Sequence, residues 1–212
     1  VSVFLRQRAL FTFTLAAGVA SWLVGNLLWL AGFSIFEVVP WWAGFLVLTI
    51  AGERLELSRF LPPSPVAQRV FIGVLAGLTF GMAFQPQVFG AALLVLALWL
   101  LRQDIARRTV KDTGLTRFIA VCLLSGYAWL ALAGAIMLAA GLAPGNAAYD
   151  AALHALMLGF VFSMVFGHAP IIFPAVLRVA VPYHPVFYAP LALLHLSLAL
   201  RLAGDLAGLA EW

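Results

Sequence analysis

The stretch DAALHALMLGFVFSMVFGHAPIIFPAVLRVAVPYHPVFYAPLALLHLSLALRLAGD, residues 150–205, decides how this chain is interpreted. It consists of two apolar runs joined by the segment RVAVPYHP, residues 178–185, whose two prolines cannot continue a helix. The runs therefore predict two antiparallel helices that are adjacent along the chain. Every histidine of the protein falls in this stretch: His154, His168, His184 and His195.

The composition of the whole chain is that of a membrane protein. Of its 212 residues 65% are hydrophobic and 9% are charged, whereas about 25% are charged in an ordinary soluble domain. The mean hydropathy is +1.08, and several runs approach the ~20 apolar residues that a bilayer-spanning helix needs. We expect an all-α polytopic transmembrane helix bundle, a single domain over residues 1–212, with the lipid bilayer as its environment.

The spacing of prolines, glycines and charged residues divides the chain into about seven spans. They are expected at residues 9–36, 38–52, 70–84, 88–101, 118–142, 150–174 and 185–209. With the N-terminus inside, eleven of the twelve Lys and Arg residues fall on the inner side, as the positive-inside rule requires. The exception, Arg201, is expected to pair with Asp205 one turn later. We predict an N-in, C-out protein of the bacterial inner (cell) membrane that does not bind nucleic acid, because topology accounts for its net charge of +4.

Two small features predict packing instead of chemistry. Cys122 is the only cysteine, which excludes an intrachain disulfide and a CxxC motif, and its apolar surroundings predict a small buried side chain. Gly73, Gly77 and Gly81 recur every four residues, a pattern typical of close helix packing in membranes.

The histidines carry the functional hypothesis, because an ionisable residue inside a span is costly and usually functional. His154 and His168 are fourteen residues apart, about 40° from alignment on an α-helix. His184 and His195 are eleven apart, about 20° from alignment if their helix is continuous. Each pair is thus expected on one face, with His168 and His184 toward the inside and His154 and His195 toward the outside.

Imidazoles offered by facing helices are axial ligands of haem iron, so this spacing predicts one or two haem b groups. The fourteen-residue separation is similar to that in dihaem b-type membrane cytochromes. Arg178 is a candidate partner for the haem propionates, or else only a topology anchor. His184 can equally be an interfacial histidine, and His154 a helix-end residue. Small residues near the first pair would admit a flat macrocycle: Ala155, Gly159, Gly167 and Ala169.

One part of the hairpin resembles a known family. The run HALMLGFVFSMVFGHAP, residues 154–170, looks like the His-Ala-Leu…Gly…Met…Gly segment of NnrS-type membrane proteins. These are haem- and copper-associated proteins linked to nitric oxide metabolism and distantly similar to subunit I of haem-copper oxidases. The resemblance is limited to this run, since the family has about a dozen spans and a later His-Thr-Gly segment that this chain lacks. It implies haem, and also copper, on His154 and His168.

Three functions follow as hypotheses. The first is a haem b protein for electron transport or diatomic-gas chemistry, led by His168 and His195, alone or as a subunit of a membrane oxidoreductase that meets other subunits or a c-type cytochrome. The second is a copper or other transition-metal handling protein in which all four histidines are metal-binding and Met157 and Met164 favour Cu(I). The third is a non-catalytic structural subunit of a membrane complex.

Overall fold

The computed structural model describes residues 9–58 and 64–207. Residues 1–8 and 59–63 and the last residues of the span expected at 185–209 lie outside this part of the chain. The helices are α2 (Leu10–Leu30), α3 (Ile35–Ser58), α4 (Pro65–Phe84), α5 (Pro86–Gln103), α6 (Ala106–Thr109), α7 (Gly114–Ala140), α8 (Ala147–His154), the π-helix η1 (Ala155–Val161), α9 (Phe162–Leu177), the 3-10 helix η2 (Pro185–Phe187) and α10 (Tyr188–Leu206).

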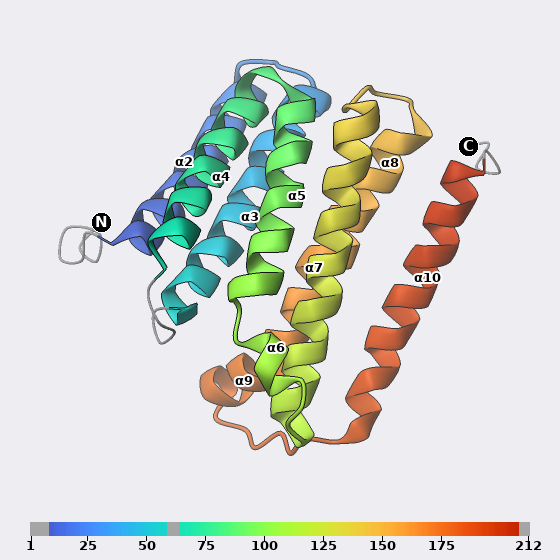
Figure 1. Ribbon diagram of the computed structural model, residues 1–212. Coiled ribbons are helices and arrows are strands. Elements are labelled where there is room, and N and C mark those ends of the chain that lie inside the picture. Colours follow the sequence, from blue (N-terminus) through green and yellow to red (C-terminus); the bar gives the residue numbers. More distant parts are fainter. Residues whose placement is uncertain (1–8, 59–63, 208–212) are drawn as a thin grey trace.

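Seven helical segments are long and apolar enough to cross a membrane, and α8, η1 and α9 together form one of them. The described residues contain no strand. The segments run alternately up and down, so that α2 begins and α10 ends at different levels of the bundle (Figure 1). The prediction of an all-α transmembrane bundle with seven spans is confirmed, and the protein is an integral membrane protein.

The first two spans differ most from the expected boundaries. The chain leaves α2 after Leu30 and turns at Gly32, whose φ of +86° a residue with a side chain rarely adopts. Ser34 then begins α3, with its backbone N–H and hydroxyl donating to the Glu37 carboxylate at 2.9 and 2.7 Å. Because α3 continues to Ser58, Arg54 lies inside a helix instead of in the connection expected there.

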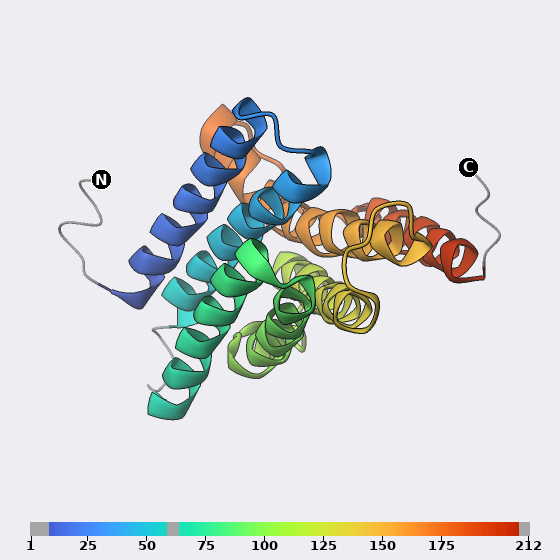
Figure 2. The same cartoon turned by 90° about the horizontal axis from the view of Figure 1, so that it is seen from above.

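The helices pack largely in chain order. α2 lies along α3, α4 along α5, and α5 along α7, which in turn packs on the continuous α8–η1–α9 span. Seen from above, that span lies between α3 on one side and α10 on the other (Figure 2). α10 stands at the edge of the bundle, and its exposed leucines make a lipid-facing surface: Leu193, Leu196 and Leu200.

Glycines bring α5 very close to its two neighbours. A Cβ atom on Gly134 of α7 would lie 2.6 Å from the backbone nitrogen of Leu94, and one on Gly90 of α5 would lie 2.5 Å from that of Leu138. On α4, Gly81 similarly faces the backbone of Phe89, and Gly77 faces Ala92. The expected glycine packing is thus confirmed for Gly77 and Gly81, whereas Gly73 has no atom within 4 Å of its built Cβ atom.

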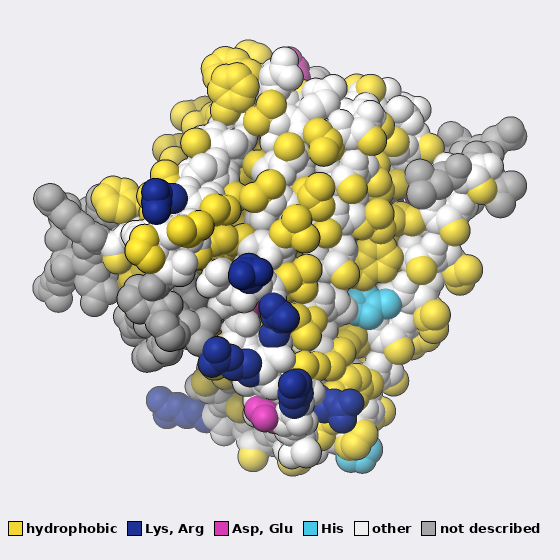
Figure 3. Space-filling model, viewed as in Figure 1, with side chains coloured by type: hydrophobic (Ala, Val, Ile, Leu, Met, Phe, Trp, Pro, Cys, Tyr) yellow, Lys and Arg dark blue, Asp and Glu magenta, His cyan; other side chains and the backbone are white. Residues whose placement is uncertain are grey.

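Positive charge collects at one end of the bundle. Lys and Arg side chains gather over the lower part of the face in Figure 3, around α6 and the connection into α7. We call this the basic end, meaning the end that holds α6, the C-terminal end of α3 and the connection from α9 to η2. The opposite end holds the turn before α8 and the C-terminal end of α10 (Figure 1).

Candidate functional site

His168 of α9 is held in one orientation by its own helix. Its Nδ1 lies 2.6 Å from the backbone oxygen of Met164, one turn earlier. Its Nε2 lies 2.8 Å from Nη2 of Arg54 on α3. Because a carbonyl only accepts and a guanidinium only donates, Nδ1 carries the proton and Nε2 carries a lone pair. The hydrogen bonds therefore indicate a neutral imidazole of His168 whose Nε2 lone pair points toward Arg54 on α3.

Arg54 is the cation beside this lone pair, and it is buried. Only 7% of the residue is exposed, and its Nε has no hydrogen-bond partner in the part of the chain that the structure describes. Arg54 also lies within electrostatic range of the Tyr127 phenol on α7. A buried arginine with an unmet donor is expensive. It is therefore a candidate for holding an anionic group.

Asp104 completes this group at the end of α5. Its Oδ2 accepts a hydrogen bond from the Tyr127 hydroxyl at 2.7 Å, and its Oδ1 accepts one from the Ala106 backbone at 2.7 Å. Tyr127 is fully buried and Asp104 is 9% exposed. Four different spans thus contribute to one polar group near the basic end, which we call the inner polar cluster: Arg54, Asp104, Tyr127 and His168.

Removing the Asp104 carboxylate is expected to destabilise the bundle. Asp104→Ala leaves the Tyr127 hydroxyl and the Ala106 N–H buried without their acceptor, each at a cost of about 1–3 kcal/mol. The thermal unfolding midpoint in detergent should fall by roughly 5–15 °C. Asp112→Ala, at an exposed position in the same connection, is the matched control and should leave the midpoint unchanged. Equal midpoints for the two variants would contradict the structural role assigned to Asp104.

An apolar groove of about 290 Å³ opens beside His168, between α3 and the η1–α9 segment. It exists because α3 packs mainly along α2 and makes few contacts with η1. His168 and Glu53 are the ionisable residues on its wall. The remaining wall is made of Phe45, Leu46, Thr49, Ile50, Val161, Met164, Val165, Ala169, Ile172 and Phe173.

The two histidines of the sixth span face different neighbours, contrary to the expected shared face. The π-helix η1 lies between them, and each π turn takes more residues than an α turn. Side chains after η1 therefore point in a different direction from the one calculated for a uniform α-helix. The predicted alignment of His154 with His168 assumed such a helix. His154 instead lies against Asp150: its Nδ1 is 2.9 Å from the Asp150 backbone oxygen and 3.2 Å from the Asp150 carboxylate.

Asp150, His154, Arg201 and Asp205 form an outer polar cluster that ties α8 to α10. Arg201 bonds Asp150 at 2.7 Å and Asp205 at 3.1 Å. The expected pairing of Arg201 with Asp205 is confirmed, and Asp150 is an additional partner that sequence spacing did not indicate. His154 thus belongs to a set of charges at the end opposite to the inner polar cluster.

His195 of α10 bonds to α7. Its Nδ1 accepts from the Trp129 indole at 2.9 Å, and its Nε2 lies 3.0 Å from the Ser125 hydroxyl. The ring also stacks on Trp129, with centroids 6.1 Å apart. Both ring nitrogens therefore have partners on a single neighbouring helix. His195 is not among the described residues that line the groove beside His168.

The remaining predicted residues lie in the connection at the basic end. His184 is exposed and precedes η2 in an extended conformation, so the continuous helix assumed for its alignment with His195 does not exist. Its Nδ1 accepts from the Val186 N–H at 3.1 Å. Arg178 ends α9 in a left-handed conformation with a φ of 55° and is exposed. The arginine that the fold places beside a histidine is therefore Arg54, not Arg178.

The small residues expected to admit a macrocycle are mostly covered. Built Cβ atoms on Gly159 and Gly167 would meet Trp129 and Cys122 of α7, and Ala155 is fully buried. Ala169 differs, since it lines the groove next to His168. In the described part of the chain no three His, Cys, Asp or Glu residues come together to hold a metal ion.

Sequence reasoning missed Arg54, Asp104 and Tyr127, because each sits in a separate segment without a motif. The only available signal was that Arg54 and Asp104 come within three residues of the ends of long apolar runs, where a longer helix carries a charge into the bundle.

The whole chain, residues 1–212, matches the family model described as a domain of unknown function, DUF8744. The chain belongs to the DUF8744 family. The match includes all four spans that build the inner polar cluster. No curated protein and no solved structure matches the chain.

Proposed function

We propose that this membrane protein binds one haem b at the groove between α3 and the η1–α9 segment, where His168 would hold the iron. The observation that carries the proposal is the state of His168: the Met164 carbonyl fixes the proton on Nδ1 and leaves Nε2 as a lone pair beside an apolar groove. A histidine oriented in this way by a backbone carbonyl is a typical metal ligand.

The donor set around the groove fits a haem. Haem iron takes an imidazole nitrogen, which His168 supplies, and the two propionates take cations, of which Arg54 is buried with an unmet donor. The wall of the groove is otherwise mainly apolar, as a macrocycle requires. Arg54 lies against Nε2 at 2.8 Å, and releasing that contact would free Nε2 for the iron and the Arg54 guanidinium for a propionate. Bound haem would supply a redox-active iron.

The chain's own residues set the properties of such a site. The Met164 carbonyl makes the imidazole a stronger donor, and the apolar wall excludes water. His168 is the only histidine on the groove wall, so it is the one imidazole of this wall that would hold the iron. A single imidazole favours binding of a diatomic gas or another redox role over bis-histidine electron transfer. We place the protein in a bacterial inner membrane with the basic end in the cytoplasm. Its partners are other subunits of a redox complex or a c-type cytochrome.

An absorption spectrum of the full chain tests the proposal. Protein purified from haem-supplied cells should show a Soret band and a dithionite-dependent alpha band, with about one haem b per chain by pyridine haemochromogen assay. Absence of a Soret band, despite folded protein, would refute haem binding. Copper at unit stoichiometry by elemental analysis would then support the metal-handling alternative.

A structural role is the second candidate, and one observation favours it. Both ring nitrogens of His168 and of His195 already have hydrogen-bond partners on other spans or on their own backbone. In that case the histidines tie α9 to α3 and α10 to α7 within a larger complex. A haem-free, monodisperse protein with unchanged stability on addition of haemin would support this alternative.

A further inference from the structure

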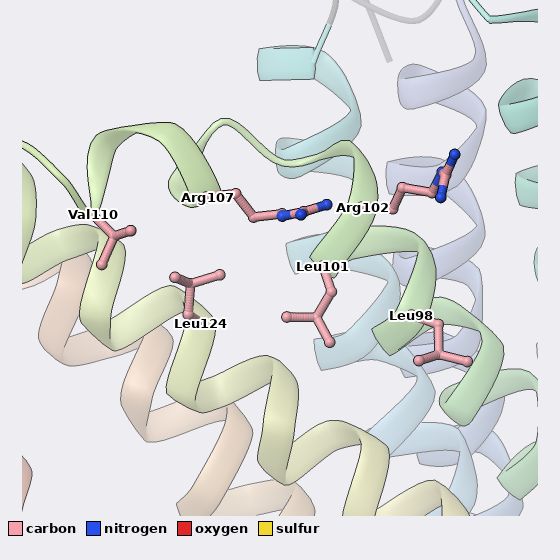
Figure 4. A pocket seen from close by; sticks show the side chains of 6 residues that line it. All are labelled: Leu98, Leu101, Arg102, Arg107, Val110 and Leu124. Carbon is pink, nitrogen blue, oxygen red and sulfur yellow. The ribbon is translucent and has the colours of Figure 1, made fainter.

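A second hollow lies on the outside of the bundle at the basic end, where α5, α6 and α7 meet. It measures about 680 Å³. Arg102 at the end of α5 and Arg107 of α6 flank it, and Figure 4 shows the Arg107 side chain extending across the hollow toward α5. The rest of its wall is apolar: Leu98, Leu101, Val110 and Leu124.

The two arginines carry uncompensated charge. Both side chains are exposed, and neither guanidinium group has a hydrogen bond or an ion pair with another described residue. The nearest carboxylate along the chain, Asp104, is buried and already accepts from Tyr127 and Ala106. The hollow therefore presents positive charge that the described part of the protein does not neutralise.

The position of this charge relative to the apolar wall indicates the ligand. Leu98 is 56% exposed and lies one turn before Arg102 along α5, toward the middle of the span. A ligand that contacts both Arg102 and Leu98 would have an anionic group at the basic end and a hydrocarbon chain along the helices. Guanidinium groups bind phosphate oxygens through paired N–H donors, and basic pockets between spans at the cytoplasmic side bind anionic lipid headgroups.

We infer that this hollow binds an anionic phospholipid of the leaflet at the basic end. Its phosphate contacts Arg102 and Arg107, and one acyl chain lies along Leu98, Leu101 and Leu124. A free phosphate would satisfy the arginines but would leave the apolar wall uncovered. This site is proposed for lipid only, and lipid binding there does not depend on haem binding.

Native mass spectrometry of the full chain in an uncharged detergent tests the site. Dioleoyl phosphatidylglycerol is titrated against wild-type protein, the double variant Arg102→Gln/Arg107→Gln, and the control Arg108→Gln/Lys111→Gln. Both variants lose two positive charges from the same connection, but the control residues do not line the hollow. We expect about tenfold or greater weakening for the first variant and less than about threefold for the control.

Two further arms distinguish other sources of the same signal. Dioleoyl phosphatidylcholine should bind wild-type protein about tenfold more weakly than the anionic lipid, since it has no net charge. Inorganic phosphate should not displace the bound phosphatidylglycerol. Displacement by phosphate, equal weakening in both double variants, or unchanged binding by Arg102→Gln/Arg107→Gln would each overturn the proposal. Equal unfolding midpoints of the variants confirm that folding is not the cause.

Discussion

Replacing His168 by glycine is expected to abolish the haem spectrum of the purified protein. His168 is the only histidine on the groove wall, so its loss leaves the iron without a nitrogen ligand from this surface. The Soret absorbance per chain should fall by more than about tenfold, and each loss of about 1.4 kcal/mol of binding free energy weakens the haem affinity tenfold. His184→Gly is the matched control, because His184 is exposed and only caps η2.

Exogenous imidazole makes this test specific to ligation. His168→Gly removes the ring and leaves space beside the Met164 carbonyl. Added imidazole should enter that space and restore the Soret band of the variant. A purely structural role of His168 would not be rescued spectroscopically. Retention of the full spectrum by His168→Gly would show that His168 is not the ligand and would remove the basis of the proposed function.

Replacing Gly134 by alanine is expected to force α5 and α7 apart. The added Cβ atom would lie 2.6 Å from the Leu94 nitrogen and 2.7 Å from the Gly90 oxygen, which are both backbone atoms and cannot turn aside. Overpacking typically costs 1–3 kcal/mol, and we expect a value near 3 kcal/mol because no side chain can relieve the contact. The unfolding midpoint in detergent should fall by about 6–12 °C.

Gly73→Ala is the control for this substitution. It is the same chemical change within a transmembrane helix, but a Cβ atom on Gly73 meets nothing within 4 Å. Alanine is also the better helix former, by about 1 kcal/mol in an exposed helix interior. Gly73→Ala should therefore keep or slightly raise the midpoint. If Gly134→Ala unfolded at the same temperature as Gly73→Ala, this would contradict the close approach of the α5 and α7 backbones at Gly134.

Much of the fold could be predicted from the amino-acid sequence alone. Apolar runs of bilayer length and the placement of Lys and Arg predict seven spans, because both depend on the interaction of each segment with lipid and water. Local spacing also predicts the ion pair of Arg201 with Asp205, found at 3.1 Å. Cys122 is fully buried, as its apolar neighbours indicate.

The arrangement of the histidines could not be predicted in this way. A constant angle per residue places His154 and His168 on one face, but η1 changes that angle in the middle of the span. η1 packs against α7, where a Cβ atom on Gly159 would meet Trp129. The constant-angle calculation contains neither this contact nor the π turn.

The sequence by itself determined that this is an all-α membrane protein whose histidines lie in and between its last two spans. Those properties follow from the transfer of each residue between water and lipid, which needs no knowledge of neighbours. Only the tertiary structure decided which charges meet inside the bundle. The side chains of Arg54 and His168, 114 residues apart in the sequence, lie 2.8 Å from each other because Arg54, near the C-terminal end of α3, reaches α9. Such partners depend on how whole spans pack, and no local pattern records them.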